Sequence, residues 1–256
     1  MEAEPFKIAL ITGAARRIGA AIAANLAENG WAVAVHYNTS EEDARALVES
    51  ITADGGKAAA VQADLTDEAA TTALIGQAAD QLGPITCLVN NASIFDRDTP
   101  ETATRESWDA HMQVNLRAPF VLTQAFNAQL QEGIEGSVVN IIDQRVWNLT
   151  PHFTSYTVSK SALWSLTRTL AQALAPRIRV NAIGPGPVLP SPRQTDEQFV
   201  QQWSSLPLRR SVMPEEICDA VRFVITAPSM TGQMIALDGG QHLGWAQPLQ
   251  GVPVDE

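Results

Sequence analysis

Short apolar runs alternate with longer segments in which apolar residues recur at helical spacing, from residue 8 to residue 237. The short runs suit buried strands, and the longer segments suit amphipathic helices. This alternation predicts a parallel sheet with helices on both faces. We therefore expect a single α/β domain, doubly wound around a seven-stranded parallel sheet. Its predicted strands are Ile8–Ile11, Trp31–Tyr37, Lys57–Ala63, Ile85–Val89, Val138–Ile142, Arg177–Ile183 and Gln233–Leu237.

Turn and capping residues mark the predicted helices. Gly30 should end the first helix, Ser40 with Asp43 should cap the second, and Thr66 should cap the third. A long helix is expected from about residue 104 to residue 130. The helix after the fifth strand should bury a stripe of residues four apart: Val158, Ala162, Leu166, Leu170 and Leu174.

An irregular segment rich in proline and glycine follows the sixth strand. It leads into a short polar helix around Asp196 to Trp203, and Pro214 opens the last helix. Long irregular segments in compact domains are usually functional, so we predict that residues 188–212 form a mobile lid over the substrate. The tail, residues 244–256, is expected either to be disordered or to reach a neighbouring subunit.

The chain is acidic and core-forming, with a formal net charge of −11, 45% hydrophobic residues and 18% charged residues. That charge argues against nucleic acid or an anionic membrane as a partner, and an anionic cofactor would need cations placed near it. The sequence contains no membrane-spanning run and no signal-peptide pattern. Cys87, Cys218 and the four histidines form no metal pattern. We expect no metal and two buried, reduced thiols in a cytoplasmic protein.

Tyr156 and Lys160 lie one helical turn apart near the start of the helix after the fifth strand. A lysine ammonium beside a phenol favours the phenolate, so the pair predicts a lowered tyrosine pKa and a proton donor near neutral pH. Alone, such a pair is more typical of a solvated helix face. In the long helix, Pro119 has no N–H for the Asn115 carbonyl, so a kink is expected there. The kink would free that carbonyl for a water linked to Lys160, or would only fit the helix to its neighbour.

A dinucleotide would bind where the first strand turns into the first helix, with its pyrophosphate at the helix N-terminus. Gly13 and Gly19 supply the tight turn and the close backbone approach, while Arg17 stands where a middle glycine is usual. A cation in the first turn opposes the helix dipole unless a phosphate binds there.

The end of the second strand lacks the carboxylate that would bind the ribose 2′-hydroxyl of NAD. Its hydroxyls and amide, with Arg17 nearby, favour the 2′-phosphate of NADPH, unless Glu41 serves NAD from one residue later. After the third strand, Asp64 and Leu65 are expected beside the adenine, although Asp64 would equally serve as a cap. The residues that end the second strand are His36, Tyr37, Asn38, Thr39 and Ser40.

Five short motifs then fall in one order along the chain, and together they resemble the short-chain dehydrogenase/reductase family over residues 6–240. The motifs are Thr12-Gly13 with Gly19, Asn90-Asn91-Ala92, Asn115, Tyr156-x-x-x-Lys160 and Pro185-Gly186. The resemblance implies a Rossmann-type sheet, a nicotinamide cofactor and a catalytic Tyr156–Lys160 pair assisted by Asn115. It implies a dinucleotide-binding half, residues 6–92, a catalytic half, residues 93–243, and a homotetramer. Further implied cofactor contacts are Ile18, Asn91, Ala92, Ser93, Pro185 and Gly186.

One position departs from most of that family, which carries serine thirteen residues before the tyrosine, where this chain has Asp143. A carboxylate facing a carbonyl that becomes an alkoxide would repel the developing charge. A carboxyl group instead suits a substrate with N–H donors or a ring nitrogen to be protonated.

Asp143, Arg17 and Phe95 together resemble the pteridine reductases, and residues 237–243 are similar to those of dihydromonapterin reductases. This resemblance implies NADPH-dependent reduction of a 7,8-dihydropterin such as dihydromonapterin or dihydrobiopterin, or of dihydrofolate. Phe95 would stack on the pterin, Ser93 and Tyr156 would contact substrate or cofactor phosphate, and Asp143 and Tyr156 would supply protons. Trp147 is expected at the pocket mouth, or else in the core or an interface.

Two alternatives stay open. One is an NADPH-dependent carbonyl or 3-oxoacyl-thioester reductase, against which Asp143 argues. The other is a non-catalytic NADPH-binding regulator, against which the intact Tyr156 and Lys160 argue.

Overall fold

Seven parallel strands form one sheet in the order β3-β2-β1-β4-β5-β6-β7. This computed structural model describes residues 7–244, so the predicted tail lies outside the described residues from residue 245 onward. The predicted doubly wound α/β fold is confirmed, because every strand connection crosses the sheet through a helix or a helical segment. The strands are β1 (Ile8–Ile11), β2 (Ala32–Tyr37), β3 (Lys57–Gln62), β4 (Cys87–Asn90), β5 (Gly136–Ile141), β6 (Ile178–Pro185) and β7 (Met234–Leu237).

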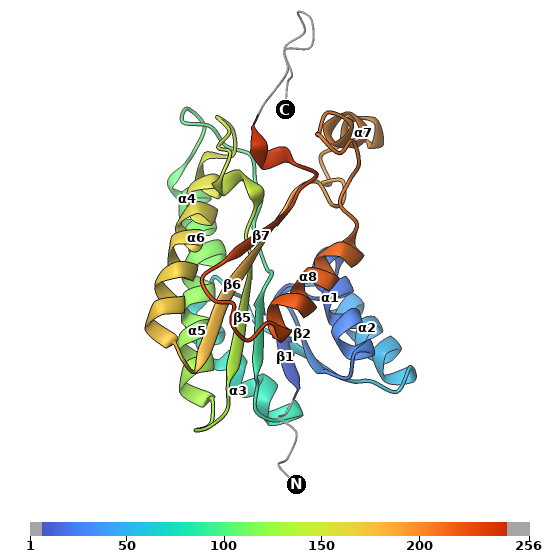
Figure 1. Ribbon diagram of the computed structural model, residues 1–256, viewed down its shortest axis with the longest axis vertical. Coiled ribbons are helices and arrows are strands. Elements are labelled where there is room, and N and C mark those ends of the chain that lie inside the picture. Colours follow the sequence, from blue (N-terminus) through green and yellow to red (C-terminus); the bar gives the residue numbers. More distant parts are fainter. Residues whose placement is uncertain (1–6, 245–256) are drawn as a thin grey trace, which may run out of the picture.

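Helices cover both faces of the sheet (Figure 1). One layer holds α1 (Arg17–Glu28), α2 (Glu41–Ala53) and α8 (Pro214–Thr226), and the other holds α3 (Glu68–Leu82), α5 (Ala118–Gln129) and α6 (Thr154–Leu174). Successive side chains of β1 enter the two cores in turn, as the period of a strand requires. The shorter elements are α4 (Arg105–Met112), η1 (Gln113–Arg117), η2 (Gln144–Val146), α7 (Asp196–Ser204) and η3 (Gln241–Leu243).

The long helix predicted from residue 104 to residue 130 is interrupted in its middle. Between α4 and α5 the chain makes one π-helical turn, η1, in which the Ala118 N–H bonds to the Gln113 carbonyl. Pro119 has no N–H to continue the α-helical ladder, so the Asn115 carbonyl loses its usual partner. The irregularity predicted at Asn115 is therefore present, as a widened turn inside the helix.

The stripe predicted to be buried on α6 was wrong at its start. Val158 is 40% exposed, and the buried residues include Tyr156, Lys160, Leu163 and Thr167, whose spacing alternates between four and three. A helix turns once per 3.6 residues, so positions four apart drift by about 40° per step. The predicted stripe consequently begins on the outer face of the helix, packs against the core from Leu166 onward and is buried at Leu170.

Two predicted caps were also misplaced. Helix α3 is capped by Asp67, whose carboxylate accepts from the N–H groups of the two residues after Glu68, and not by Thr66. Helix α2 does follow Ser40, but within residues 7–244 the Ser40 side chain makes no capping hydrogen bond. Asp43, its predicted partner, instead forms an ion pair with Arg16. Gly30 ends α1 as predicted, with a φ of 81° that favours glycine.

Within residues 7–244, no helix is long and apolar enough to cross a membrane. The same residues contain no group of three or more histidine, cysteine or acidic side chains placed to hold a metal ion. Cys87 and Cys218 are free and buried, in agreement with the prediction for the two thiols.

Candidate active site

The predicted site residues gather at the carboxyl ends of β1, β4, β5 and β6. Strands β1 and β4 are neighbours, although β2 and β3 separate them in the sequence. After β1 the chain enters α1 on one face of the sheet, and after β4 it enters the helices of the opposite face. The gap between the carboxyl ends of β1 and β4 is therefore the topological switch point of the sheet. In open parallel sheets, ligands bind at such a switch point.

The turn after β1 depends on two glycines. Gly13 has a φ of 61°, and a Cβ on Gly19 would lie 2.3 Å from the Gly13 carbonyl oxygen and 2.5 Å from Asn91 Nδ2. Arg17, at the position of the usual middle glycine, also has a left-handed φ of 56°. That conformation costs a residue with a side chain about 1–2 kcal/mol.

His36 holds this turn in place from inside the protein. It is buried, its Nδ1 accepts from the Gly13 N–H at 3.0 Å, and its Nε2 lies 3.1 Å from the Ala63 carbonyl oxygen. An acceptor at Nδ1 leaves the proton on Nε2, which donates to Ala63. Burial lowers the pKa of His36 to about 4, so the ring is neutral near pH 7. Its side chain positions the turn and does not reach toward a ligand.

The end of β4 is bonded to the same turn. Asn91 Nδ2 donates to the carbonyl oxygens of Thr12 and Gly13, at 2.9 and 3.1 Å. The backbone N–H groups of Asn91 and Ala92 both donate to Thr12 Oγ1, at 3.0 Å. These predicted cofactor contacts therefore form one rigid unit with the glycine turn.

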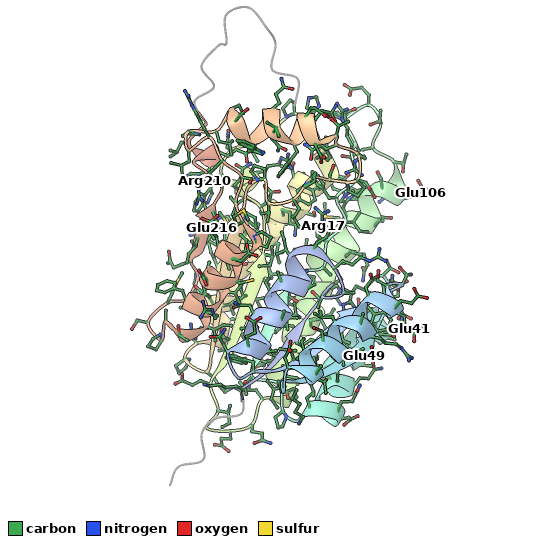
Figure 2. The ribbon with its side chains drawn as sticks, turned by 90° about the vertical axis from the view of Figure 1, so that its right-hand side faces the viewer. Arg17, Glu41, Glu49, Glu106, Arg210 and Glu216 are labelled. Carbon is green, nitrogen blue, oxygen red and sulfur yellow. The ribbon has the colours of Figure 1, made fainter. Side chains whose placement is uncertain are left out.

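The predicted nearness of Arg17 to the end of β2 is not found. Its guanidinium donates to the carbonyl oxygens of Leu189 and Pro190, at 3.3 and 3.0 Å, at the start of the lid. Figure 2 shows Arg17 at the end of α1 that faces the lid. The cation at the end of β2 is Arg16, whose guanidinium lies 2.5 Å from the Asp43 carboxylate, three residues after Ser40. Sequence reasoning missed it because neighbouring residues in a turn point in different directions.

The two carboxylates at this edge, Glu41 and Asp64, have protein partners. Glu41 forms an ion pair with Arg45, 2.6 Å away, along the surface of α2. Asp64 Oδ1 accepts from the backbone N–H and the hydroxyl of Thr66, so its carboxylate caps that turn. A cap was one of the two roles predicted for Asp64, the other being contact with the adenine. Leu65 is buried in the core. The side chains at the end of β2 that remain exposed to a ligand are Asn38, Thr39 and, in part, Tyr37 and Ser40.

The catalytic candidates meet at the start of α6. The Tyr156 hydroxyl donates to Asp143 Oδ2 at 2.8 Å. Asp143 Oδ1 accepts from the Arg145 N–H, also at 2.8 Å, which fixes the carboxylate at the start of η2. Lys160 Nζ donates to the Ile141 carbonyl oxygen at 2.9 Å and lies 5.7 Å from the centre of the Tyr156 ring.

The prediction of a lowered pKa for Tyr156 was wrong for this arrangement. Burial and the Asp143 carboxylate raise the pKa of Tyr156 well above its ordinary value, and the cation of Arg145 offsets only part of that effect. Burial also lowers the pKa of Lys160 to about 8, opposed by Asp143. Tyr156 is therefore a neutral phenol, which is the form that donates a proton.

Asn115 acts through its side chain. It is fully buried, and its Oδ1 accepts from the Ile94 N–H at 2.8 Å and from the Ser93 hydroxyl at 3.2 Å. Its Nδ2 donates to the Ile94 carbonyl oxygen at 2.9 Å and to Ser159 Oγ at 3.1 Å. Asn115 thus connects the loop after β4 to α6, and the water relay from its carbonyl stays a prediction.

A narrow cavity of about 160 Å³ lies between the glycine turn, η2 and the lid. On its wall, the Phe95 ring stacks on Phe153 with centroids 4.4 Å apart and contacts the edge of Tyr156 at 4.6 Å. One face of Phe95 is therefore occupied by Phe153, and its stacking on a substrate stays a prediction. The described lining includes Arg17, Ile18, Phe95, Asp143, Pro185 and Gly186.

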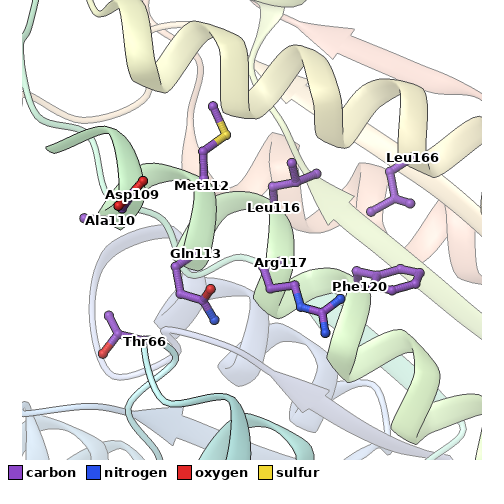
Figure 3. Close-up of a pocket in the computed structure, with 9 residues that line it drawn as sticks. All are labelled: Thr66, Asp109, Ala110, Met112, Gln113, Leu116, Arg117, Phe120 and Leu166. Atoms are coloured by element: carbon purple, nitrogen blue, oxygen red, sulfur yellow. The ribbon is translucent and has the colours of Figure 1, made fainter. Parts of the chain in front are cut away.

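Trp147 does not line the narrow cavity as it is formed by residues 7–244. It is 44% exposed, and its ring meets Trp164 and His242 edge-on at 6.5 and 5.3 Å. A much larger hollow, about 840 Å³, opens over α4, η1, α5 and α6 (Figure 3). Its described lining is apolar for the most part and consists of residues other than the predicted catalytic ones.

Arginine contacts hold the lid over the narrow cavity. Besides the Arg17 contacts, Arg193 forms an ion pair with Asp96 at 3.2 Å and donates to the Phe95 carbonyl oxygen. At the other end of the lid, Arg210 forms an ion pair with Glu216 at the start of α8 (Figure 2). A cavity of about 160 Å³ is too small for a dinucleotide and a substrate together. That residues 188–212 form a mobile lid stays a prediction.

A doubly wound sheet, a glycine turn at its switch point and a buried tyrosine–lysine pair define a nicotinamide-dependent oxidoreductase. The family model described as enoyl-(acyl carrier protein) reductase matches residues 13–242. The chain belongs to the short-chain dehydrogenase/reductase family.

Similar proteins fall into two groups. By sequence, the chain is 38% identical to an uncharacterised oxidoreductase of Methylorubrum extorquens, covering 91% of this chain and 97% of the relative. It is 34% identical to the 3-oxoacyl-[acyl-carrier-protein] reductase FabG of Staphylococcus aureus, covering 93% and 98%. By structure, it is similar to FolM alternative dihydrofolate reductase 1 from Brucella canis, complexed with NADP, at a TM-score of 0.93 and 51% identity, covering 97% and 100%.

The cofactor is NADPH, and the residues at this edge fit it. The close approach at Gly19 leaves backbone N–H groups at the start of α1 for the pyrophosphate. Arg16 pairs with Asp43, three residues beyond Ser40, and is a cation to which a 2′-phosphate could bind, while Glu41 is turned onto α2 by Arg45. A 2′-phosphate would compete with Asp43 for the Arg16 guanidinium.

Proposed function

We propose that the protein reduces a 7,8-dihydropterin, such as dihydromonapterin or dihydrobiopterin, or dihydrofolate, with NADPH. The observation that carries the proposal is the hydrogen bond from Tyr156 to Asp143, where most of the family places a serine hydroxyl beside the tyrosine. The similarity to the Brucella canis protein, an alternative dihydrofolate reductase, supports the same substrate class.

Reduction of a ring C=N bond adds a hydride to carbon, supplied by NADPH when it is bound, and a proton to nitrogen. Tyr156 is a neutral phenol, so its hydroxyl can give that proton. Asp143 adds an acceptor for ring N–H donors and passes a proton to Tyr156 when it is itself protonated. Lys160 stands behind the phenol as the nearest cation on α6, with Nζ 5.7 Å from the ring.

A second candidate follows from the similarity to FabG, which suggests reduction of a 3-oxoacyl thioester. Such a substrate presents a carbonyl oxygen that gains negative charge during the reaction. At this site that oxygen would approach the Asp143 carboxylate beside Tyr156, a contact that opposes the developing charge.

The deciding experiment measures NADPH oxidation with dihydropterins, dihydrofolate, ketones and acetoacetyl thioesters. We expect turnover of the pterins and poor turnover of the thioesters. Asp143→Ser and Tyr156→Phe should each lower kcat for the pterin by at least about 10²-fold, the effect typical of losing one proton-transfer group. The Kd for NADPH should stay nearly unchanged.

Thioester reduction with inactive pterins would contradict the proposal and favour the FabG-like activity. Inactivity on all of the substrates, with NADPH still bound, would favour a non-catalytic regulator. We further propose a homotetramer and a cytoplasmic location, where free, buried thiols such as Cys87 and Cys218 stay reduced.

A further inference from the structure

Arg145 is a buried cation in the candidate site that the mechanism above does not use. Its side chain is 13% exposed, and it lines the narrow cavity together with Asp143 and Phe95. Among residues 7–244 its guanidinium donates no hydrogen bond, and its Nε is buried without a partner. The nearest carboxylate oxygen, Asp143 Oδ2, is 3.6 Å from the terminal nitrogen Nη1, which is ion-pair distance and too long for a hydrogen bond.

Packing holds this guanidinium in place. Its central carbon lies 5.2 Å from the centre of the Phe95 ring and 5.1 Å from that of Phe153. The backbone N–H of Arg145 is fixed by Asp143 Oδ1 at 2.8 Å. The side chain is therefore preorganised by aromatic contacts, while the N–H donors of its terminal nitrogens remain available to an acceptor in the cavity.

Buried donors are almost always satisfied by the protein or by water, and a ligand that enters the cavity can take the place of such a water. The carboxyl group of Asp143 and the guanidinium of Arg145 offer an acceptor and a donor side by side in one cavity. A ligand that complements both must carry an N–H donor next to an oxygen acceptor on the same edge. The pyrimidinone part of a pterin has this pattern, with the ring N3–H beside the C4 oxo oxygen. A simple ketone or a 3-oxoacyl thioester has the oxygen and no neighbouring N–H.

We propose that Arg145 is a substrate-binding residue that donates to the oxo oxygen of the pterin ring while Asp143 accepts from the adjacent ring N–H. The inference rests on the proposed pterin reductase function and adds to it a specificity: the site selects 4-oxo pteridines over 4-amino pteridines. An amino group at that position presents N–H donors to a guanidinium, which also has only donors.

The test pairs one substitution with two ligands. Arg145→Met keeps an unbranched side chain against Phe95 and Phe153 and removes the charge and all of the donors. Binding of pterin and of 2,4-diaminopteridine is measured by titration calorimetry, with the wild type and the variant each saturated with NADP⁺. We expect the variant to bind pterin at least tenfold more weakly and the diamino compound as tightly as the wild type or more tightly.

Arg168→Met is the matched control, because Arg168 also lies over an aromatic ring, that of Trp164, but on the exposed side of α6. It should leave both affinities unchanged. Arg145→Lys restores the charge without the planar fork, and it should recover only part of the preference for pterin.

Equal weakening of both ligands in Arg145→Met would overturn the assignment, because a residue that only balances the charge of Asp143 or packs the site affects both alike. No change for either ligand would overturn it as well. If the wild type binds neither pteridine but reduces thioesters, the proposed function fails and the Arg145 assignment fails with it.

Discussion

Asp143 alters the chemistry of the tyrosine more than any other single residue of the site. A serine hydroxyl beside Tyr156 would share a proton with it, whereas the Asp143 carboxylate accepts from it at 2.8 Å. Together with burial, that negative charge keeps the pKa of Tyr156 well above its ordinary value. The lysine four residues later does not reverse the direction, and burial lowers the pKa of its own ammonium to about 8.

Arg16 and Arg17, in the glycine turn, contact different parts of the protein. Replacing each of them should therefore change the preference for NADPH over NADH differently. Wild-type kcat/KM should favour NADPH over NADH by at least about tenfold, or about 1.4 kcal/mol. Arg16→Ala should remove most of that preference by lowering kcat/KM with NADPH, since Arg16 is the cation at the end of β2. Arg17→Gly should keep the preference, because Arg17 contacts the lid. Steady-state kinetics with both cofactors measures each effect.

Arg105→Ala is the control for this pair, because Arg105 is an exposed cation on α4 that is paired with Asp109 and is not at the end of β2. It should leave the ratio unchanged. Loss of the preference in Arg17→Gly but not in Arg16→Ala would show that the guanidiniums exchange places when the nucleotide binds.

Individual site residues could be predicted where one motif specifies both the residue and its neighbour. Tyr156 and Lys160 were found because helical spacing relates them, and Asn115 because Pro119 disturbs its helix. Arg145 was missed, since it stands two residues after Asp143 in a short 3-10 turn, where no period indicates the direction of a side chain. Arg17 was predicted near the end of β2, where Arg16 was missed, for a similar reason: the left-handed φ of Arg17 changes the direction of the chain at this point.

At the scale of elements, the start of α6 depends on a residue far from it in sequence. Asp98, 3% exposed, accepts from the Ser155 N–H at 3.1 Å and from the Ser155 hydroxyl at 2.5 Å. Its carbonyl oxygen accepts from the N–H of Phe153, which has a left-handed φ of 59°. The loop after β4 therefore caps the helix that carries Tyr156.

Asp98→Ala should lower both stability and turnover. The Ser155 donors would lose a buried, charged acceptor, at a cost of about 1–3 kcal/mol, and the first turn of α6 would move with Tyr156. We expect kcat to fall about tenfold, since a small misplacement at a reacting group is costly, with the Kd for NADPH within about twofold of the wild type. Thermal unfolding, kinetics and cofactor titration together check these outcomes.

Asp67→Ala provides the comparison, because Asp67 caps α3 in the same way. It should lower the Tm comparably and leave kcat as in the wild type. If the two variants lose kcat in equal proportion to their Tm, Asp98 contributes only to general stability and does not position Tyr156.

Element boundaries were predictable where a residue physically ends a helix or begins one. Pro214 opens α8, and Gly30 closes α1, as expected. The burial pattern of α6 was not predictable from five residues at a spacing of four. At that spacing each residue lies about 40° further around the helix than the one before, so the stripe does not stay on one face. The cap of α3 was misassigned because Thr66 and Asp67 are both capping residue types, and only the backbone geometry distinguishes them.

At the scale of the whole molecule, the arrangement of a sheet between two helix layers follows from the alternation of strands and helices. This arrangement brings together the site residues at the carboxyl ends of β1, β4, β5 and β6. The contacts of the predicted lid, residues 188–212, were not predictable in the same way. They join Arg17 and Arg193 to backbone carbonyl oxygens, which carry no sequence signal. The predicted lid, residues 188–212, does hold α7 and borders the narrow cavity.

The large hollow offers a test of the predicted assembly. It joins α4, η1, α5 and α6 (Figure 3), and within residues 7–244 its lining includes Met112, Leu116, Phe120 and Leu166. We expect these helices to pair subunits, because the helices in residues 104–130 and 155–174 resemble those that do so in this family. A homotetramer with two-fold symmetry is expected. Phe120→Glu with Leu166→Glu should give a smaller species, because the charges would be buried in the interface. Light scattering at micromolar concentration measures the mass.

Leu208→Glu is the matched change at another exposed apolar residue, 65% exposed in the lid. It should leave the mass unaltered. A monomeric wild type at micromolar concentration rejects the tetramer outright, and an unchanged mass in the double variant rejects this face as the contact.

The sheet also decides how the protein can be attached to a surface or to another protein. Strand β1 begins at Ile8, at the amino edge, whereas η3 follows β7 at the carboxyl edge, where His242 meets Trp147 (Figure 1). An affinity tag or a fusion partner joined ahead of β1 would stand at the end of the molecule away from the lid. One joined beyond η3 would be tethered near the predicted lid. For immobilisation on a biosensor chip or in a flow reactor, the amino-terminal end is the appropriate handle.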